Sequence, residues 1–350
     1  MTSDLLTVKL NKLTYGGDAL GRLSDGRAVF VPFALPGETV SLRSLDEKRG
    51  HVRAELVEIL EPSPERIASK CLHFGVCGGC HYQHLSHPVQ LIAKTGILHD
   101  QLTRIGKIEA PPLKPMVPSS KEWNYRNHVQ FHLTQAGQLG FIDALSRNIL
   151  PIRECHLPEP SLNILWPRLE FDPGLWLERV SLRLGMDEQA MLVLESGSPD
   201  TPELELEADL SVVHLAVEDA VVMAGDDHLI MLVNDRLFHV SAASFFQVNT
   251  GMAGKMVKFL LDNLPVSPAT TLLDVYCGVG LFSAFFAPHV GHLIGIESSP
   301  SACDDFSINL DEFDNVELYQ APAEEVLPAL KVKPDILILD PPRAGLEKGV

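Results

Sequence analysis

Three cysteines, Cys71, Cys77 and Cys80, fall within ten residues of a chain that has only six cysteines. Gly78 and Gly79 between them provide a permissive backbone, so successive thiolates of this short loop can face one common point. An ordinary hydrophobic core does not need thiols at this density. The segment therefore predicts a metal or cluster site, which the surrounding chain must fold around.

A fourth ligand is needed, and Cys155 is the best candidate. Cys277 lies in a glycine turn that has another role, and Cys303 lies as a lone thiol in a predicted helix. Zinc sites usually show two paired cysteine knuckles, whereas three clustered cysteines and one distant cysteine are more typical of an iron–sulfur cluster. The spacing therefore favours a cluster, with zinc as the alternative. The chain starts without the pattern of a secretory signal, so we expect a reducing cytoplasm and no disulfides.

Length and charge set wide bounds on the function. A chain of 350 residues, 45% of them hydrophobic, is long enough for two or three domains, and no apolar run is long enough to predict a membrane span. The net charge of −18 is not typical of a protein that binds nucleic acid. However, the acidic excess is concentrated in residues 151–235, with 18 Asp and Glu against 4 Lys and Arg. Residues 1–150, with 17 basic and 14 acidic residues, are the only region whose charge suits a nucleic acid, and this excess is too small to count as evidence.

The first two-thirds of the chain are rich in strand patterns. Residues 1–62 contain about five short apolar segments separated by turns, which predict a small closed barrel of the oligonucleotide-binding type. Residues 88–106 have the spacing of a helix with an apolar stripe. Residues 127–240 alternate with a period of two, which predicts a largely antiparallel sheet. We therefore predict a central domain, residues 63–240, that includes the cysteine loop.

After residue 240 the pattern changes to alternating strands and helices. Strands are predicted at 271–275, 292–297, 316–319 and 335–340, with helices at 281–287 and 302–310 between them. This alternation predicts a parallel, doubly wound sheet that binds its ligand at the carboxyl ends of the strands. The predicted fold class is thus a multidomain α+β protein whose last domain, residues 241–350, is Rossmann-like.

The glycine turn after the first of these strands narrows the class of ligand that the sequence predicts. Gly278 and Gly280 allow the backbone to approach a ligand, and Glu297 at the end of the next strand can accept hydrogen bonds from a ribose. These features fit a dinucleotide or S-adenosylmethionine equally. Ser283 stands where a dinucleotide site has its third glycine, and Asp340 begins an Asp-Pro-Pro-Arg turn, as in enzymes that methylate nucleobases or amides. Both details favour S-adenosylmethionine over NAD.

Taken together, these motifs resemble, nearly end to end, the iron–sulfur-containing 23S ribosomal RNA (uracil-5-)-methyltransferases. The segment from Gly26 to Glu38 is similar to the family's amino-terminal TRAM barrel. The resemblance implies that a 4Fe–4S cluster is bound by the cysteines Cys71, Cys77, Cys80 and Cys155. Further similar segments are Trp-Asn-Tyr-Arg-Asn at 123–127, Leu-Gly-Phe at 139–141, Ser-Phe-Phe-Gln-Val-Asn at 244–249 and Asp-Val-Tyr-Cys-Gly-Val-Gly at 274–280.

The resemblance also implies the residues of the active site. Gln247, Tyr276, Glu297 and Asp340 would line the pocket for S-adenosylmethionine and uracil, and Phe245 would pack near the flipped base. The cluster is expected to have a structural role, because methyl transfer from a sulfonium moves no net electrons. RNA, with ribosomal RNA expected, is the only implied partner.

Carbon 5 of uracil is a poor nucleophile, so a thiolate first adds at carbon 6 and the resulting enolate attacks the methyl group. A base then removes the proton of carbon 5, and the thiolate leaves. In the family a Cys and a Glu downstream of the Asp-Pro-Pro-Arg turn do this work. No Cys lies between Asp340 and Val350, and both the nucleophile and the base are expected beyond Val350. Cys277 is not expected to replace the nucleophile, because it fills space in the cofactor turn.

We therefore expect a carboxyl-terminally truncated methyltransferase without catalytic residues of its own, which is inactive alone and leaves the fourth strand as an open apolar edge. Two alternatives remain at this point. One is an RNA-binding module without catalysis, and the other is an NAD-dependent oxidoreductase.

Overall fold

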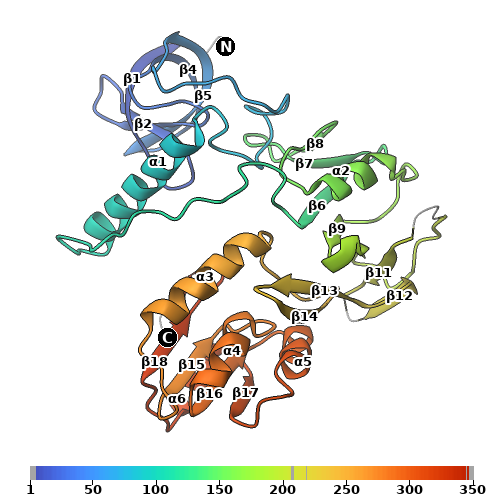
Figure 1. The fold of residues 1–350 in the computed structure, drawn as a ribbon. Helices are drawn as coiled ribbons and strands as arrows, with labels where there is room; N and C mark the ends of the chain where they lie inside the picture. Colours follow the sequence, from blue (N-terminus) through green and yellow to red (C-terminus); the bar gives the residue numbers. More distant parts are fainter. Residues whose placement is uncertain (1–4, 206–208, 218, 344, 347–350) are drawn as a thin grey trace. The chain divides into compact units, whose positions relative to one another are not determined.

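The computed structural model, drawn as a ribbon in Figure 1, describes residues 5–205, 209–217, 219–343 and 345–346. The chain divides into two compact units. The amino-terminal unit comprises Met1–Glu122 with Gln138–His156, and the carboxyl-terminal unit comprises Trp123–Gly137 with Leu157–Val350. The predicted boundaries after residues 62 and 240 both fall inside these units, so the predicted domains stay predictions.

Five strands of the amino-terminal unit close into a barrel in the order β1-β2-β3-β5-β4, as predicted. They are β1 (Leu6–Leu13), β2 (Ala19–Arg22), β3 (Ala28–Val31), β4 (Thr39–Glu47) and β5 (His51–Glu61). Val8 and Leu10 of β1 are buried while their neighbours are exposed, because alternate side chains of a strand point to opposite faces. The inward set forms the barrel's own core.

The rest of this unit contains one long helix and one hairpin. Helix α1 (His87–Asp100) continues into a π-helical turn, η1 (Gln101–Ile105), which confirms the predicted helix. No residue of α1 is buried, and Ile92 is 72% exposed, so the predicted apolar stripe does not join the barrel core. β7 (Leu139–Ile142) and β8 (Ile149–Pro151) pair as an antiparallel hairpin.

The carboxyl-terminal unit begins with a sheet in which five strands run in the order β12-β11-β10-β9-β6. The strands are β6 (His128–Leu133), β9 (Arg179–Leu184), β10 (Ala190–Glu195), β11 (Ser211–Leu215) and β12 (Ala220–Ala224). Their pairings are antiparallel except that of β10 with β11, so the largely antiparallel prediction is confirmed with one exception. β13 (His228–Val233) and β14 (Arg236–Ser241) form a separate hairpin. Short helical segments are α2 (Pro160–Leu165), η2 (Trp166–Arg168) and η3 (Met186–Glu188).

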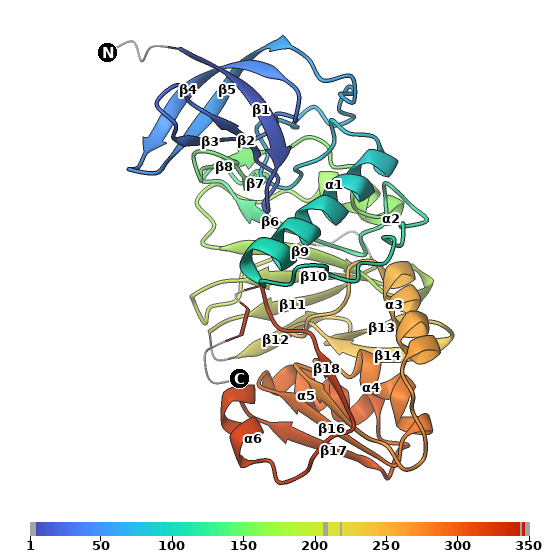
Figure 2. The same cartoon turned by 90° about the vertical axis from the view of Figure 1, so that its left-hand side faces the viewer.

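A four-stranded parallel sheet in the order β17-β16-β15-β18 completes this unit and confirms the predicted alternation (Figure 1 and Figure 2). Its strands are β15 (Thr271–Val275), β16 (His292–Glu297), β17 (Val316–Gln320) and β18 (Ile336–Leu339). The helices are α3 (Thr250–Asn263), α4 (Leu281–Phe286), η4 (Ala287–His289), α5 (Pro300–Asn309) and α6 (Ala323–Ala329). Leu337 and Leu339 on the edge strand β18 are 54% and 39% exposed.

Successive side chains of the parallel strands point to opposite faces of the sheet, so the sheet has a separate hydrophobic core on each face. Leu272 and Leu293 point to the face covered by α3, α4 and α5, whereas Leu273 and Ile294 point to the opposite face, covered by α6. The first core continues without a break into β10, β11, β13 and β14. Across the described part of the chain, the helices are all too short or too polar to cross a lipid bilayer.

Candidate functional site

Three predicted site segments meet at one edge of the parallel sheet. The register places Val275 of β15 between Ile296 of β16 and Leu339 of β18. The residues that follow these three strands therefore emerge side by side. The backbone N–H of Asp340 also lies 3.4 Å from the carbonyl oxygen of Val275. The structure thus brings the glycine turn, Glu297 and Asp340 together, as expected for a ligand at the carboxyl ends of the strands.

The Glu297 carboxylate is held in place by three backbone N–H groups. Its Oε2 accepts from Gly278 at 3.0 Å, and its Oε1 accepts from Ser298 at 2.7 Å and Ser299 at 2.8 Å. The side chain is half-buried, so it remains reachable from solvent. Each carboxylate oxygen can accept more than one hydrogen bond. Glu297 is therefore a fixed acceptor with capacity left for the hydroxyl groups of a ligand.

The two glycines of the turn have different reasons to be glycine. Gly280 has a φ of +88°, and a Cβ there would lie 2.4 Å from Cδ1 of Leu310 and 3.0 Å from the Phe306 ring. Gly278 has a φ of +54° and nothing within 4 Å of its Cβ position. Gly280 therefore allows the turn to pack on the end of α5, whereas Gly278 leaves open space above the turn. Tyr276 also has a left-handed backbone, with a φ of 65°.

A buried carboxyl group that the sequence did not single out lies under this edge. Asp274 is 1% exposed, and burial raises its pKa to about 6. Its Oδ2 accepts a 2.7 Å hydrogen bond from Ser283, the residue that replaces the third glycine. The charges of Asp340 and Glu297 raise the pKa of Asp274 further, which shows that the three carboxyl groups share one region. This edge therefore favours a positively charged ligand.

The loop that carries Phe245 and Gln247 is held by residues distant in sequence. Arg183 Nη1 donates to the Ser244 carbonyl oxygen at 2.8 Å, and Asn127 Nδ2 donates to that of Gln247 at 3.1 Å. The hydroxyl groups of Ser244 and Ser301 are 2.7 Å apart, which joins the loop to the first turn of α5. Since α5 follows directly after Glu297, this contact connects the loop to the site.

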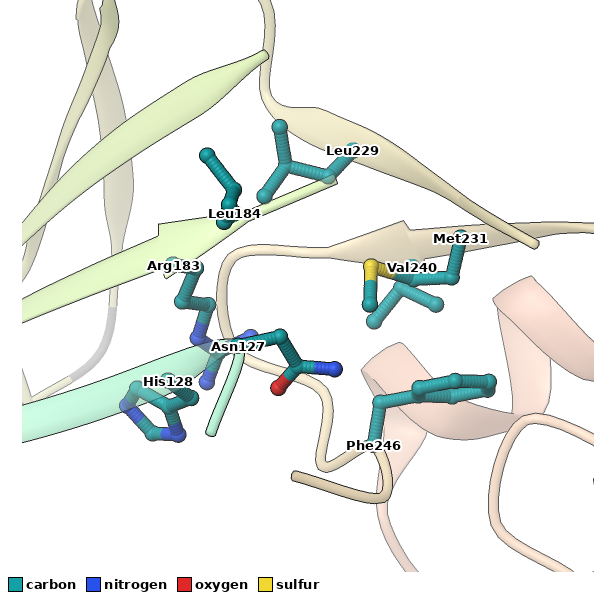
Figure 3. A pocket seen from close by; sticks show the side chains of 8 residues that line it. All are labelled: Asn127, His128, Arg183, Leu184, Leu229, Met231, Val240 and Phe246. Carbon is teal, nitrogen blue, oxygen red and sulfur yellow. The ribbon is translucent and has the colours of Figure 1, made fainter. Parts of the chain in front are cut away.

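Figure 3 shows the small cavity behind this loop. It is lined by Asn127, His128, Arg183, Leu184, Leu229, Met231, Val240 and Phe246. Its volume of about 20 Å³ is room for roughly one water molecule and not for a nucleoside. Burial, with the nearby charges of Arg183 and Arg126, lowers the pKa of His128 to about 3, so this imidazole stays neutral. Phe246 packs inward here, whereas Phe245 is 67% exposed and available to a ligand.

The four predicted cysteine ligands all lie in the amino-terminal unit. The Sγ atoms of Cys71 and Cys77 each accept a backbone N–H at 3.4 Å, from His73 and Gly79. Burial raises the pKa of Cys77, and the nearby Cys80 and Cys71 raise it further. Cys71, Cys77 and Cys80 therefore lie near one another, and two of their sulfurs accept backbone N–H groups.

The segment before Cys155 contacts this loop directly. The N–H of Arg153 donates to His73 Nε2 at 3.0 Å, and the N–H of Leu72 donates to Glu154 Oε1 at 2.6 Å. Cys155 thus follows two residues that touch the residues after Cys71. The four cysteines therefore belong to one unit, and the segment that carries Cys155 contacts the loop that carries Cys71.

Comparison with known proteins adds to this geometry. The family described as tRNA (Uracil-5-)-methyltransferase matches residues 207–350, and the TRAM domain family matches residues 3–57. An uncharacterized RNA methyltransferase of Synechocystis sp. is 31% identical, over 97% of this chain and 82% of its own length. Another, from Aquifex aeolicus, is 32% identical, over 97% of this chain and 84% of its own length.

Among solved structures, the fold is similar to that of the Pyrococcus abyssi tRNA (uracil-54, C5)-methyltransferase in complex with S-adenosyl-L-homocysteine. The TM-score is 0.72, with 23% sequence identity, covering 97% of this chain and 84% of that one. At 23% sequence identity, this similarity shows that the two proteins share a fold.

Proposed function

The chain belongs to the RNA (uracil-5-)-methyltransferase family with a TRAM domain, and we propose that it binds S-adenosylmethionine between the Gly278 turn, Glu297 and Asp340. We further propose that its substrate is a uridine of ribosomal RNA in the cytoplasm, methylated at carbon 5. When bound, S-adenosylmethionine supplies an electrophilic methyl group on a positively charged sulfur.

The observation that supports this site best is the fixed carboxylate of Glu297. Its hydrogen bonds from Gly278, Ser298 and Ser299 aim it across the glycine turn, where a ribose would lie. The open space over Gly278 leaves room for the ligand, and the shared negative charge of Asp274 and Asp340 suits a sulfonium. Gln247, Tyr276 and Gly280 complete the proposed cofactor site, and exposed Phe245 would stack on the flipped uracil.

Calorimetric titration tests this proposal. The chain is expected to bind S-adenosylhomocysteine and not NAD. In the Glu297→Gln variant the affinity is expected to fall about 10–100-fold, because a charged acceptor of ribose hydroxyls is lost. Glu317→Gln, an exposed acid on the neighbouring strand β17, serves as the matched control and should bind as the parent does. Preference for NAD, or equal affinity of the Glu297→Gln variant, would contradict the site.

Turnover needs a thiolate, and the two cysteines of the carboxyl-terminal unit do not offer one. Cys277 and Cys303 are both buried, and burial raises the pKa of Cys303 to about 11 and that of Cys277 also well above its usual value. Both stay protonated and shielded. We therefore propose that the 350-residue chain binds its cofactor without methylating RNA, and methyl transfer to a uridine-containing RNA by this chain would disprove that.

We also propose that Cys71, Cys77, Cys80 and Cys155 hold a 4Fe–4S cluster with a structural role. Anaerobically purified protein is expected to be coloured and to contain iron and inorganic sulfide in equal amounts. Cys155→Ser should lose most of the iron and the visible absorption, because one corner of the cluster loses its thiolate. Cys303→Ser, a buried thiol of the other unit, should keep both. A colourless parent that binds zinc instead would identify the alternative metal.

A further inference from the structure

Two histidines and an aspartate gather on the β13–β14 hairpin, away from the residues assigned above. The register pairs Ile230 with His239, so His228, two residues before Ile230, lies diagonally across from His239 on the same face. The two imidazole rings stack with centroids 3.9 Å apart. Asp227 Oδ1 lies 2.8 Å from His228 Nδ1. One nitrogen or oxygen atom from each of these three residues lies within 4.8 Å of the other two.

A fourth residue, Asp305 of α5, fixes the state of His239. Asp305 is fully buried, and its carboxylate accepts from the Ser241 N–H at 2.9 Å and from the Ser241 hydroxyl at 2.6 Å. Its Oδ1 also lies 2.8 Å from His239 Nδ1. Because a carboxylate only accepts, this contact places a proton on His239 Nδ1, so Nε2 is the nitrogen that can bind a ligand.

We propose that His228, His239 and Asp227 bind a divalent transition-metal ion of the zinc class, with Asp305 as the residue that positions His239. Imidazole nitrogens and a carboxylate oxygen are suitable ligands for such an ion, and water would complete its coordination. A buried carboxylate that orients a histidine through Nδ1 is the usual support of a metal-binding imidazole. The stacked rings would turn slightly so that their nitrogens converge on the ion.

The surroundings favour a cation and leave it a way in. His239 also lines an open hollow of about 530 Å³, together with Asp235, Asp311 and Glu312. Arg236, the basic residue of this lining, pairs with Glu312 at 2.7 Å. The Asp227 side chain is 68% exposed, so an ion can reach its carboxylate from solvent. The site therefore has both the charge and the access that metal binding requires.

An ion at this point would brace the hairpin against α5. His239 belongs to β14, and its partner Asp305 belongs to α5, the helix that starts next to Glu297. Because the ion would bind the folded hairpin and not the unfolded chain, it would raise the thermal midpoint of the protein. This role is independent of cofactor binding, so failure of one proposal leaves the other standing.

Titration with Co²⁺ alone, followed by absorption, separates this site from the cysteine loop, because only thiolate ligands give intense sulfur-to-metal bands. The parent chain is expected to bind one Co²⁺ without such bands and to gain thermal stability. The His228→Gln and His239→Gln variants should bind at least about 100-fold more weakly, and Asp305→Asn about 10–100-fold more weakly. Asp226→Asn, an exposed acid beside the cluster, is the matched control and should bind as the parent does.

Each variant is compared with itself, with and without the ion, so that a loss of stability in the metal-free protein does not confuse the result. The Co²⁺-induced shift of the thermal midpoint should vanish in the histidine variants and persist in Asp226→Asn. Equal affinity in the parent and both histidine variants would overturn the proposal. So would binding that occurs only with thiolate bands, which would identify a stacked histidine pair with a purely structural role.

Discussion

Replacing Arg66 with alanine is expected to lower the free energy of unfolding of the amino-terminal unit by about 3–5 kcal/mol. Arg66 pairs through Nε and Nη2 with the Glu38 carboxylate, at 2.5 and 2.9 Å. Glu38 is fully buried, and it also accepts from the N–H groups of Leu35 and Ser63. The variant leaves a buried carboxylate without its counter-charge, which costs far more than the loss of a surface pair.

Hydrogen exchange of the β4 and β5 amides measures this effect within the barrel. Arg53→Ala is the matched control, because Arg53 is 68% exposed and lies 3.9 Å from Asp18, so its loss should cost at most about 1 kcal/mol. Equal protection of the β4 and β5 amides in the Arg66→Ala variant and the parent would contradict the argument.

The deficit of the Arg66→Ala variant should also depend on pH. Burial by itself raises the pKa of Glu38, but the hydrogen bonds from Arg66, Leu35 and Ser63 outweigh it and hold the pKa below its usual value. The stability that ionised Glu38 contributes is therefore complete above its unfolded-state pKa and is lost as the pH falls through its folded-state pKa. The difference between variant and parent is expected to shrink in acid, because protonated Glu38 no longer needs a positive partner.

The second large effect is expected at Gly280. Gly280→Ala should destabilise the carboxyl-terminal unit by about 2–5 kcal/mol, since the new Cβ must adopt a left-handed backbone and lies 2.4 Å from a core methyl group of Leu310. Thermal and denaturant unfolding followed by circular dichroism measures the loss. A variant as stable as the parent would show that the turn can move away from α5.

Gly278→Ala is the informative counterpart of this variant. Its Cβ enters open space, so the stability cost should be only the backbone cost of about 1–2 kcal/mol. The same Cβ points into the space proposed for the ligand, so the affinity for S-adenosylhomocysteine should fall while the fold persists. A Gly278→Ala variant that binds as tightly as the parent would place the ligand elsewhere.

The sequence predicted the elements whose signals are local. The barrel strands are short apolar segments separated by turns, and the parallel strands are apolar runs that alternate with helices. The glycine turn and Glu297 lie within twenty residues of one another in one strand–turn–helix–strand segment. A parallel sheet aligns the ends of its strands, so the meeting of Gly278, Glu297 and Asp340 followed from the fold class alone.

The supports of the site could not be predicted in this way. In the sequence Arg183 is only one polar position of a strand with alternating polarity. In the structure it donates a hydrogen bond to the carbonyl oxygen of Ser244, sixty-one residues later. Asn127 lies in a segment that resembles a sequence motif of the family, but its hydrogen bond to the carbonyl oxygen of Gln247 depends on tertiary packing. The pairing of His239 with Asp305 likewise joins a strand to a helix with no common pattern. Such contacts depend on three-dimensional distance, which periodicity does not report.

The chain crosses between its two units three times, because residues 123–137 belong to the carboxyl-terminal unit and residues 138–156 return to the amino-terminal one. A fragment cut at a single point, such as residues 157–350, therefore lacks β6 and the hydrogen bond from Asn127 to the loop of Gln247. Modular exchange of the two units between relatives would need several coordinated junctions. Recombination at one junction is expected to yield chimaeras that misfold, so the two units should be inherited together.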